Sequence, residues 1–316
     1  MKRYVISLLT IASVLTACKD HFDIDSMENP SKLVVYCFPS QADTTYISVT
    51  GSVGVRKIVD SRKPGKLSDA RVSYMVNGEP RQIQQDADGT FFVTGGHQPG
   101  DHVTLQVEHD DYGRAVAQTT VPEGIAVTLK EIRIVTEYEP DFESMRDFYQ
   151  LSASFKDPAE STDYYAVRVR VGSDGDMLAA DVRWPEIYVN DEPLLNRLSA
   201  IDEDFGFENM FYQRIYFFTD RDINGQQYVL HLNINTNHLE YRAWNPRFQV
   251  LLYRLTPDYY RYLKSINDIE NNELAQGGFA QLMPTFSNVS GGLGLMGGFW
   301  ASESEWIEIK RENEDE

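Results

Sequence analysis

The chain has 316 residues, and 29 Lys and Arg residues against 48 Asp and Glu residues give it a formal charge of −19 and a pI of about 4.7. This acidity excludes a typical nucleic-acid-binding protein, because phosphate recognition needs clustered Lys and Arg residues that this sequence lacks. Hydrophobic residues make up 42% of the chain and charged residues 24%, so we expect a sizeable folded core in one large domain or two moderate ones.

Residues 1–17 have the features of a secretory signal peptide. The charged pair Lys2-Arg3 precedes an apolar run from Tyr4 to Leu15, which is too short to span a bilayer. The run ends in Leu15-Thr16-Ala17-Cys18, which resembles a bacterial lipobox, in which the Cys thiol takes a diacylglycerol before cleavage. We therefore predict that the mature chain begins at a lipidated Cys18; the alternative is an incidental Cys beside an ordinary signal peptide.

Residues 18–31 are predicted to be a tether between the membrane anchor and the folded body. The acid-rich segment Lys19 to Asp25 looks like the export signal of Bacteroidota surface lipoproteins, although a solvated tether without a sorting role explains it equally well. Two cysteines are too few for a disulfide framework. We expect Cys37, inside the apolar run Leu33 to Phe38, to be a buried small hydrophobic residue.

The first half of the remaining chain alternates apolar and polar residues in short segments bounded by turn residues, the pattern of β-strands. Asn77-Gly78 and Asp88-Gly89 supply the positive-φ residues that hairpins require. Strands without intervening helices favour a β-sandwich at residues 32–122, ended by Val121-Pro122-Glu123-Gly124. The predicted strands are Leu33–Phe38, Thr45–Gly51, Ala70–Val76, Thr90–Thr94, His102–Glu108 and Ala115–Val121.

The second half repeats this pattern with longer strands, so we expect a second sandwich at residues 123–311, followed by an acidic tail at residues 312–316. The overall fold class is thus all-β, with two Ig-like or transthyretin-like sandwiches. The predicted strands are Val127–Glu137, Tyr149–Phe155, Tyr164–Gly172, Arg214–Thr219, Tyr228–Ile234, Phe248–Leu255 and Trp306–Lys310.

One helix is predicted, at residues 257–271. Thr256 is placed to cap it, Pro257 suits the first helical position and Asp258 favours the helix dipole. Apolar residues recur on one face from Tyr259 to Ile269, so we expect this helix to pack on a sheet as a structural element.

The motifs that commonly carry chemistry are mostly absent. Gly292 to Gly297 matches G-x-G-x-x-G, but it lacks the following helix and acid of a dinucleotide site, and we interpret it as a glycine-kinked strand. The segment Asp86 to Gly89 begins like a calcium loop and is better explained as a hairpin turn. The six His residues show no metal-ligand spacing. The sequence therefore predicts no cofactor, no metal and no catalytic residue, although acids can pair through space in a β protein.

The excursion between the strands at residues 191–213 combines aromatic and acidic side chains. Aromatic residues give large contact areas at low entropic cost, and acids select cationic or hydroxyl-rich targets. We predict that any partner touches this loop, through Asp202, Glu203, Asp204, Phe205, Phe207, Phe211 and Tyr212. The alternative is that these aromatic side chains fold back and close the end of the sandwich.

The C-terminal quarter resembles a family of Bacteroidota lipoproteins catalogued as domain of unknown function 4249. The resemblance rests on the run from Val250 to Ser265 and on Pro284 to Gly298, in which Ser287-Asn288-Val289 leads into the glycine-rich stretch. The lipobox, the strand at Val34-Val35-Tyr36 and the boundary at Val121-Pro122 also match, so the resemblance covers nearly the whole mature chain. Met296 and the link Gln276-Gly277-Gly278-Phe279 depart mildly from the pattern.

This resemblance implies two β-rich domains in a lipoprotein of the outer membrane, often encoded beside a TonB-dependent transporter, and it implies no catalytic residues. We expect a non-enzymatic binding or accessory protein, anchored through Cys18, exposed at the cell surface and associated with such a transporter. The alternatives are a surface hydrolase that uses spatially paired carboxylates, and an adhesin-like structural module.

Overall fold

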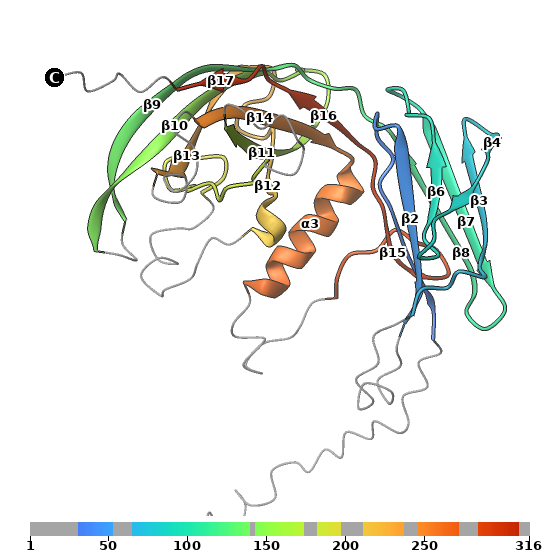
Figure 1. Cartoon of the computed structure of the whole chain (residues 1–316). Helices are drawn as coiled ribbons and strands as arrows, with labels where there is room; N and C mark the ends of the chain where they lie inside the picture. The colour runs from blue at the N-terminus through green and yellow to red at the C-terminus, as the bar shows by residue number, and fades with distance from the viewer. Residues whose placement is uncertain are drawn as a thin grey trace, which may run out of the picture.

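The computed structural model describes residues 31–52, 65–139, 143–173, 182–196, 211–236, 246–271 and 284–309. It confirms the all-β class, with two sandwich domains and one prominent helix (Figure 1). The first half contains strands β1 (Leu33–Cys37), β2 (Thr44–Gly51), β3 (Arg71–Val76), β4 (Glu79–Arg81), β5 (Gln84–Gln85), β6 (Phe91–Thr94), β7 (His102–His109) and β8 (Gly113–Thr120). The second half contains β9 (Val127–Glu139), β10 (Ser144–Lys156), β11 (Tyr164–Ser173), the short 3-10 helix η5 (Tyr212–Arg214), β12 (Tyr216–Thr219), β13 (Gln227–Asn235), β14 (Pro246–Leu255), α3 (Pro257–Glu270), β15 (Leu293–Met296), β16 (Phe299–Glu303) and β17 (Ile307–Glu308).

The first domain is a sandwich of two sheets, in the orders β15-β1-β2-β6-β5 and β4-β3-β7-β8. Alternate residues of each strand point inward, and Leu33, Val35 and Cys37 of β1 are almost completely buried, as the period-2 pattern predicts. Both hairpin turns form as predicted, since Asn77, Gly78 and Gly89 have positive φ values.

The glycine-rich segment corrects the predicted domain boundary. We expected residues 123–311 to form the second sandwich, but β15 pairs in parallel with β1, with Val35 opposite Gly294, and so belongs to the first sheet. Gly294 has a φ of 113°, and a Cβ atom there would collide with the carbonyl oxygen of Val35. The segment is thus a kinked strand that another backbone approaches closely, and not a nucleotide-binding loop.

The second domain is a sandwich of the sheets β13-β10-β9 and β12-β11-β14-β16, with β17 also paired to β14. A core of inward-facing residues such as Leu151, Val169 and Val250 fills the space between the sheets. Residues 182–196 contact both sheets of this sandwich, because Arg183 bridges to Val171 of β11 and Tyr188 bridges to Asn233 of β13.

Helix α3 covers the outer face of the β11 sheet. Leu263 is buried against Ala166, Phe217 and Leu255, so the predicted apolar face packs on a sheet as expected. The predicted cap is wrong: Thr256 makes no side-chain capping bond, and its Oγ1 is buried without a hydrogen-bond partner within the described residues. Its backbone N–H instead donates to the carbonyl of Gly298.

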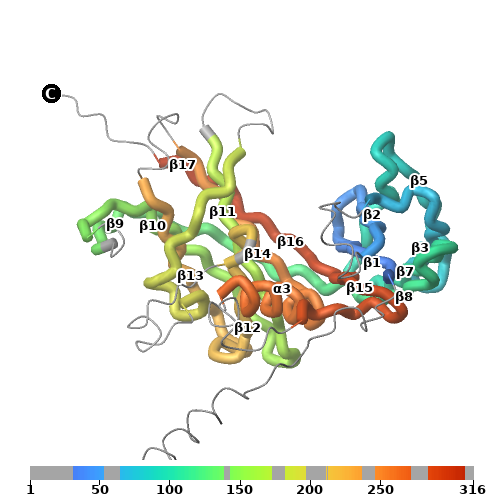
Figure 2. The backbone as a smooth tube through the Cα atoms, turned by 90° about the horizontal axis from the view of Figure 1, so that it is seen from below, coloured from blue at the N-terminus to red at the C-terminus, as the bar shows by residue number. Residues whose placement is uncertain are grey.

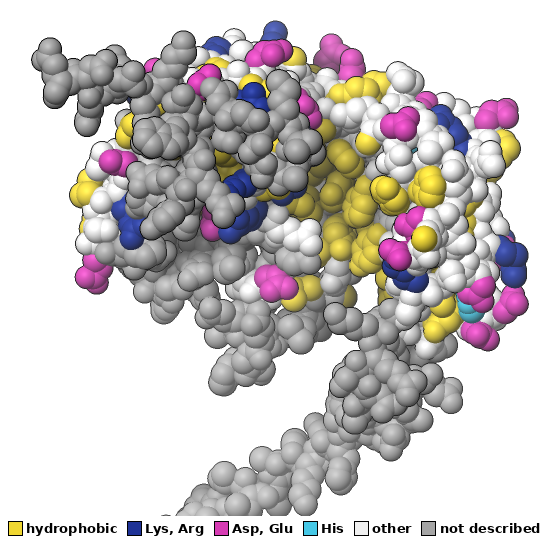
Figure 3. Space-filling model, viewed as in Figure 1, with side chains coloured by type: hydrophobic (Ala, Val, Ile, Leu, Met, Phe, Trp, Pro, Cys, Tyr) yellow, Lys and Arg dark blue, Asp and Glu magenta, His cyan; other side chains and the backbone are white. Residues whose placement is uncertain are grey.

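The two domains meet along α3 and the strands β15 and β16. Figure 2 shows β16 running from the second domain toward the first, and Figure 3 shows hydrophobic side chains gathered on the face between them. Tyr36 and Phe38 of the first domain contact Tyr262 and Tyr259 of α3, with ring centroids 5.9 and 5.1 Å apart. Among the described residues, no helix has the length and apolarity needed to cross a membrane.

Candidate functional site

A recess of about 450 Å³ opens in the second domain beside residues 182–196. Its walls come from residues 182–196, from Arg214 at the end of η5 and from the end of β13. The lining residues are Arg183, Trp184, Pro185, Glu186, Arg214, Ile234 and Asn235. The volume falls within the range of small-ligand pockets, and the lining combines apolar surface with charged groups.

Guanidinium groups surround the indole ring of Trp184. Those of Arg168 and Arg170 lie 3.8 and 5.1 Å from the ring centroid, in cation–π geometry. Arg214 donates from Nη1 to the carbonyl of Trp184 at 3.2 Å, and its Nη2 lies 3.5 Å from the carboxylate of Glu186. The ring is therefore held between positively charged side chains in a protein that is otherwise strongly acidic.

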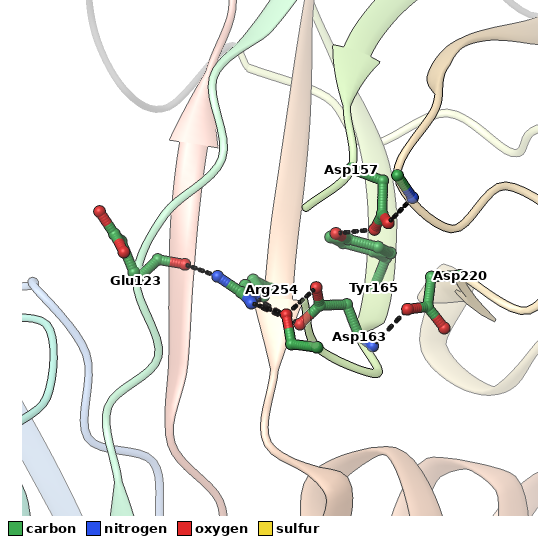
Figure 4. Close-up of polar contacts among 8 residues, drawn as sticks. Glu123, Asp157, Asp163, Tyr165, Asp220 and Arg254 are labelled. Atoms are coloured by element: carbon green, nitrogen blue, oxygen red, sulfur yellow. Dashed lines mark hydrogen bonds and ion pairs between the residues drawn. The ribbon is translucent and has the colours of Figure 1, made fainter. Parts of the chain in front are cut away.

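A second polar centre lies in the opposite part of the same domain, where three buried aspartates meet (Figure 4). Asp157 follows β10, Asp163 precedes β11 and Asp220 follows β12, and one ligand atom from each lies within 4.8 Å of the others. Arg254 of β14 donates from Nε and Nη2 to Asp163 Oδ1, and Tyr165 donates its hydroxyl to Asp157 Oδ1 at 2.5 Å.

The surroundings of these aspartates fit a satisfied hydrogen-bond network better than a metal centre. Both oxygens of Asp157 and both of Asp163 accept hydrogen bonds from protein groups, including the backbone N–H of Gly225 and the hydroxyl of Ser161. A hard cation such as Ca²⁺ takes six to eight oxygen ligands and would compete with those donors. Burial, and then the neighbouring Asp157 and Asp163, raise the pKa of Asp220.

A pair of carboxyl groups lies on the polar face of β13. Asn233 is fully buried, and its Nδ2 donates to both oxygens of Glu137 at 3.0 and 3.1 Å and to Asp191 Oδ2 at 2.8 Å. Burial, followed by the hydrogen bond and charge of Asp191, raises the pKa of Glu137 to about 7. Because these groups come from two strands and a loop, no sequence spacing predicts their contact.

Most of the predicted contact residues cannot be placed. Cys18, Asp202, Glu203, Asp204, Phe205 and Phe207 lie outside the described residues. Phe211 is half-buried, and its ring packs against those of Tyr216 and Phe217 at 5.0 and 5.4 Å, as the fold-back alternative expects for this residue. The backbone of Tyr212 begins η5, which leads to Arg214 in the wall of the recess.

The other titratable groups singled out by the sequence have structural surroundings. Cys37 is completely buried, and burial raises the pKa of its thiol. His97 is buried between the hydroxyl of Tyr74 at 2.7 Å and the carbonyl of Ser40 at 3.0 Å, and burial lowers its pKa. Asp86 Oδ1 accepts from the backbone N–H groups of Asp88 and Thr90, which closes the predicted hairpin turn.

The family model named domain of unknown function (DUF4249) matches residues 19–305, which is nearly the whole chain after Cys18. The chain belongs to this DUF4249 family. Its match spans both sandwiches, α3 and the glycine-rich β15 together, which confirms the resemblance found in the C-terminal quarter. No curated protein sequence matches the chain.

Proposed function

We propose that this DUF4249 protein is an outer-membrane lipoprotein, anchored through Cys18 and exposed at the cell surface. In that position it acts as a non-enzymatic binding or accessory component of a TonB-dependent transporter. The observation that carries the proposal is the run Leu15-Thr16-Ala17-Cys18 after a short apolar segment, which specifies lipidation in bacteria. Acyl chains on Cys18 supply about 0.8 kcal/mol per buried methylene, which is enough for stable anchoring.

The length of the tether supports work close to the membrane. Strand β1 begins at Leu33, so residues 19–32 separate Cys18 from the first strand. A fully extended chain spans at most about 3.5 Å per residue, which keeps the start of β1 within roughly 50 Å of Cys18. A body held at this distance is suited to act on a membrane-embedded partner.

Binding is favoured over hydrolysis by the spacing of the acids. Glycoside hydrolysis with paired carboxyl groups needs a separation of about 5–10 Å, with one group free to act on the substrate. Glu137 and Asp191 are bonded to the same amide group, and the three buried aspartates lie within 4.8 Å of one another among bound donors. The recess beside Trp184 offers space and charged groups for a ligand without such a pair.

Affinity purification of the tagged full-length protein from native outer membranes tests the transporter association. We expect a TonB-dependent transporter to co-purify with the wild-type protein, and we expect a Cys18→Ala variant to leave the membrane fraction. Cys37→Ala is the matched control, because Cys37 is buried in the first domain and should not affect anchoring. A Cys18→Ala protein that stays in the membrane contradicts the anchor. Repeated purification of a surface-exposed protein without a transporter contradicts the association.

A further inference from the structure

Two cationic side chains, Arg183 and Arg214, and one acidic side chain, Glu186, line the recess. Arg183 makes no ion pair with any residue that the structure describes. Arg214 has Glu186 as its carboxylate partner at 3.5 Å, and both side chains are more than half exposed, so this pair is weak. Two guanidinium groups in the wall of one recess therefore remain available to an anion.

The walls of the recess are also fixed in place. Arg168 stacks on Trp184 at 3.8 Å, and its Nε is buried without a hydrogen-bond partner within the described part of the chain. The backbone of Arg183 is held by two hydrogen bonds to the backbone of Val171, of 2.9 and 3.0 Å, while its side chain is exposed. The fixed Trp184 ring and Arg183 backbone lower the entropic cost of binding, because they lose little further freedom when a ligand enters.

The backbone at Arg214 is strained. Gln213 and Arg214 have φ values of 54° and 55°, in the left-handed region that residues other than glycine rarely adopt. Such outliers are energetically costly and cluster at ligand-binding sites. These two consecutive residues direct Arg214 toward the recess, where its Nη1 donates to the carbonyl of Trp184.

We propose that this recess binds a small organic carboxylate. The carboxylate group pairs with Arg183 and Arg214, since planar guanidinium groups match carboxylate geometry. The flat or apolar part of the ligand lies against Trp184, Pro185 and Ile234. This inference deepens the proposed function by naming a ligand class, and it depends on that function only in treating the protein as a binding protein.

Ligand-observed NMR with purified full-length protein in detergent tests the inference. The probes are matched acid and amide pairs: benzoate with benzamide, indole-3-acetate with indole-3-acetamide, and glucuronate with glucuronamide. We expect at least one acid to bind and its amide to bind at least roughly tenfold more weakly, because a charge-assisted hydrogen bond contributes about 1.5–3 kcal/mol. Added salt should weaken binding of the acid, because it screens the charges.

Variants at the recess locate the binding. Arg183→Gln and Arg214→Gln should each weaken binding of the acid by roughly tenfold or more. Arg71→Gln removes the same charge from an exposed site in the first domain and should leave binding unchanged. Thermal unfolding of each variant checks that it is folded. No binding of any acid, equal binding of acid and amide, or unchanged binding by both recess variants overturns the proposal. None of these outcomes affects transporter co-purification, so the two proposals fail separately.

Discussion

A buried ion pair between Arg254 and Asp163 stabilises the second domain close to its connection with the first. Arg254 joins Asp163 to the backbone carbonyl of Glu123, the residue that leads from the first domain into the second (Figure 4). The side chains of Arg254 and Asp163 are only 15% and 6% exposed, so water does little to stabilise either charge. Removing one partner therefore leaves the other charge uncompensated.

Replacing Arg254 with Met should destabilise the protein by about 3–5 kcal/mol, because Asp163 would remain buried without its cation. Chemical denaturation followed by circular dichroism measures this loss. Arg254→Lys should recover part of it, since Lys keeps the charge but not the two donors to Oδ1. Arg71→Met is the control, as its exposed pairs with Asp110 and Glu108 contribute little to stability. Equal losses in Arg254→Met and Arg71→Met would show that burial of the pair does not matter.

Glu137 should make stability depend on pH. Its pKa rises from 4.5 when exposed to about 7 in the folded protein, so the folded state holds more protons than the unfolded state between these values. The contribution of Glu137 to stability is therefore full below pH 4.5 and is lost as the pH rises through 7. The charged groups facing it are Asp191 and Arg146, which lies opposite Glu137 in the register of β9 and β10.

Glu137→Gln keeps the shape and one oxygen that can accept from Asn233 Nδ2, but it removes the charge. We expect this variant to be more stable than the wild type at pH 8, and the difference should shrink toward pH 5. Thermal melts across this range measure it, with Glu131→Gln on the same strand as the control. A variant that is less stable than the wild type at pH 8 would refute the interpretation of the pair.

At the scale of elements, β15 connects the end of the chain to its beginning. Its four residues pair with β1 over Val34 to Cys37, and the backbone N–H of Gly297 donates to the carbonyl of Cys37 at 3.0 Å. A parallel pair between segments this far apart in sequence needs close approach of two backbones, which the glycines permit.

Gly294→Val should therefore destabilise the first domain by more than about 3 kcal/mol, because the new side chain collides with the Val35 carbonyl and φ is positive. Hydrogen exchange of the β1 amides measures the effect where it arises. Gly65→Ala is the matched control, since nothing lies within 4 Å of a Cβ atom there. Normal protection of β1 in Gly294→Val would contradict the pairing.

The whole molecule is two sandwiches, and the C-terminal part of the chain contributes to both. The first domain takes β15 from the C-terminal part of the chain, and Gln41 exchanges two hydrogen bonds with the backbone of Ala301 in β16, at 2.5 and 3.2 Å. The contact of Tyr36 and Phe38 with α3 adds aromatic packing at the same junction. The domains should therefore not unfold independently.

A fragment of residues 19–122 should be unfolded or poorly protected, although it contains β1 through β8, because it lacks β15 and the cover provided by α3. Circular dichroism and hydrogen exchange test this expectation, and a fragment of residues 123–316 added in trans should restore protection. A fragment of residues 19–122 that unfolds cooperatively with stability near that of the full chain would contradict the dependence of the first domain on β15 and α3.

The sequence by itself determined the local features of this protein. Strand patterns predicted most strands of both sandwiches but missed β4, β5 and β16, and Pro257 with the following apolar face predicted α3, because these patterns act between near neighbours. Family membership also followed from local motifs, from the lipobox to the glycine-rich stretch. The predicted Thr256 cap does not form, and the buried Thr256 Oγ1 has no hydrogen-bond partner among the described residues.

Only the tertiary structure decided which distant segments meet. It placed β15 beside β1, joined Asp157, Asp163 and Asp220 around Arg254, and set Arg183, Trp184 and Arg214 around one recess. A strand pattern specifies which face of a segment is buried, but it does not specify the partner across the sheet or the loops that meet at its end. The residues of the candidate site come from separate segments that only the tertiary structure brings together, so the sequence predicted its elements and not its location.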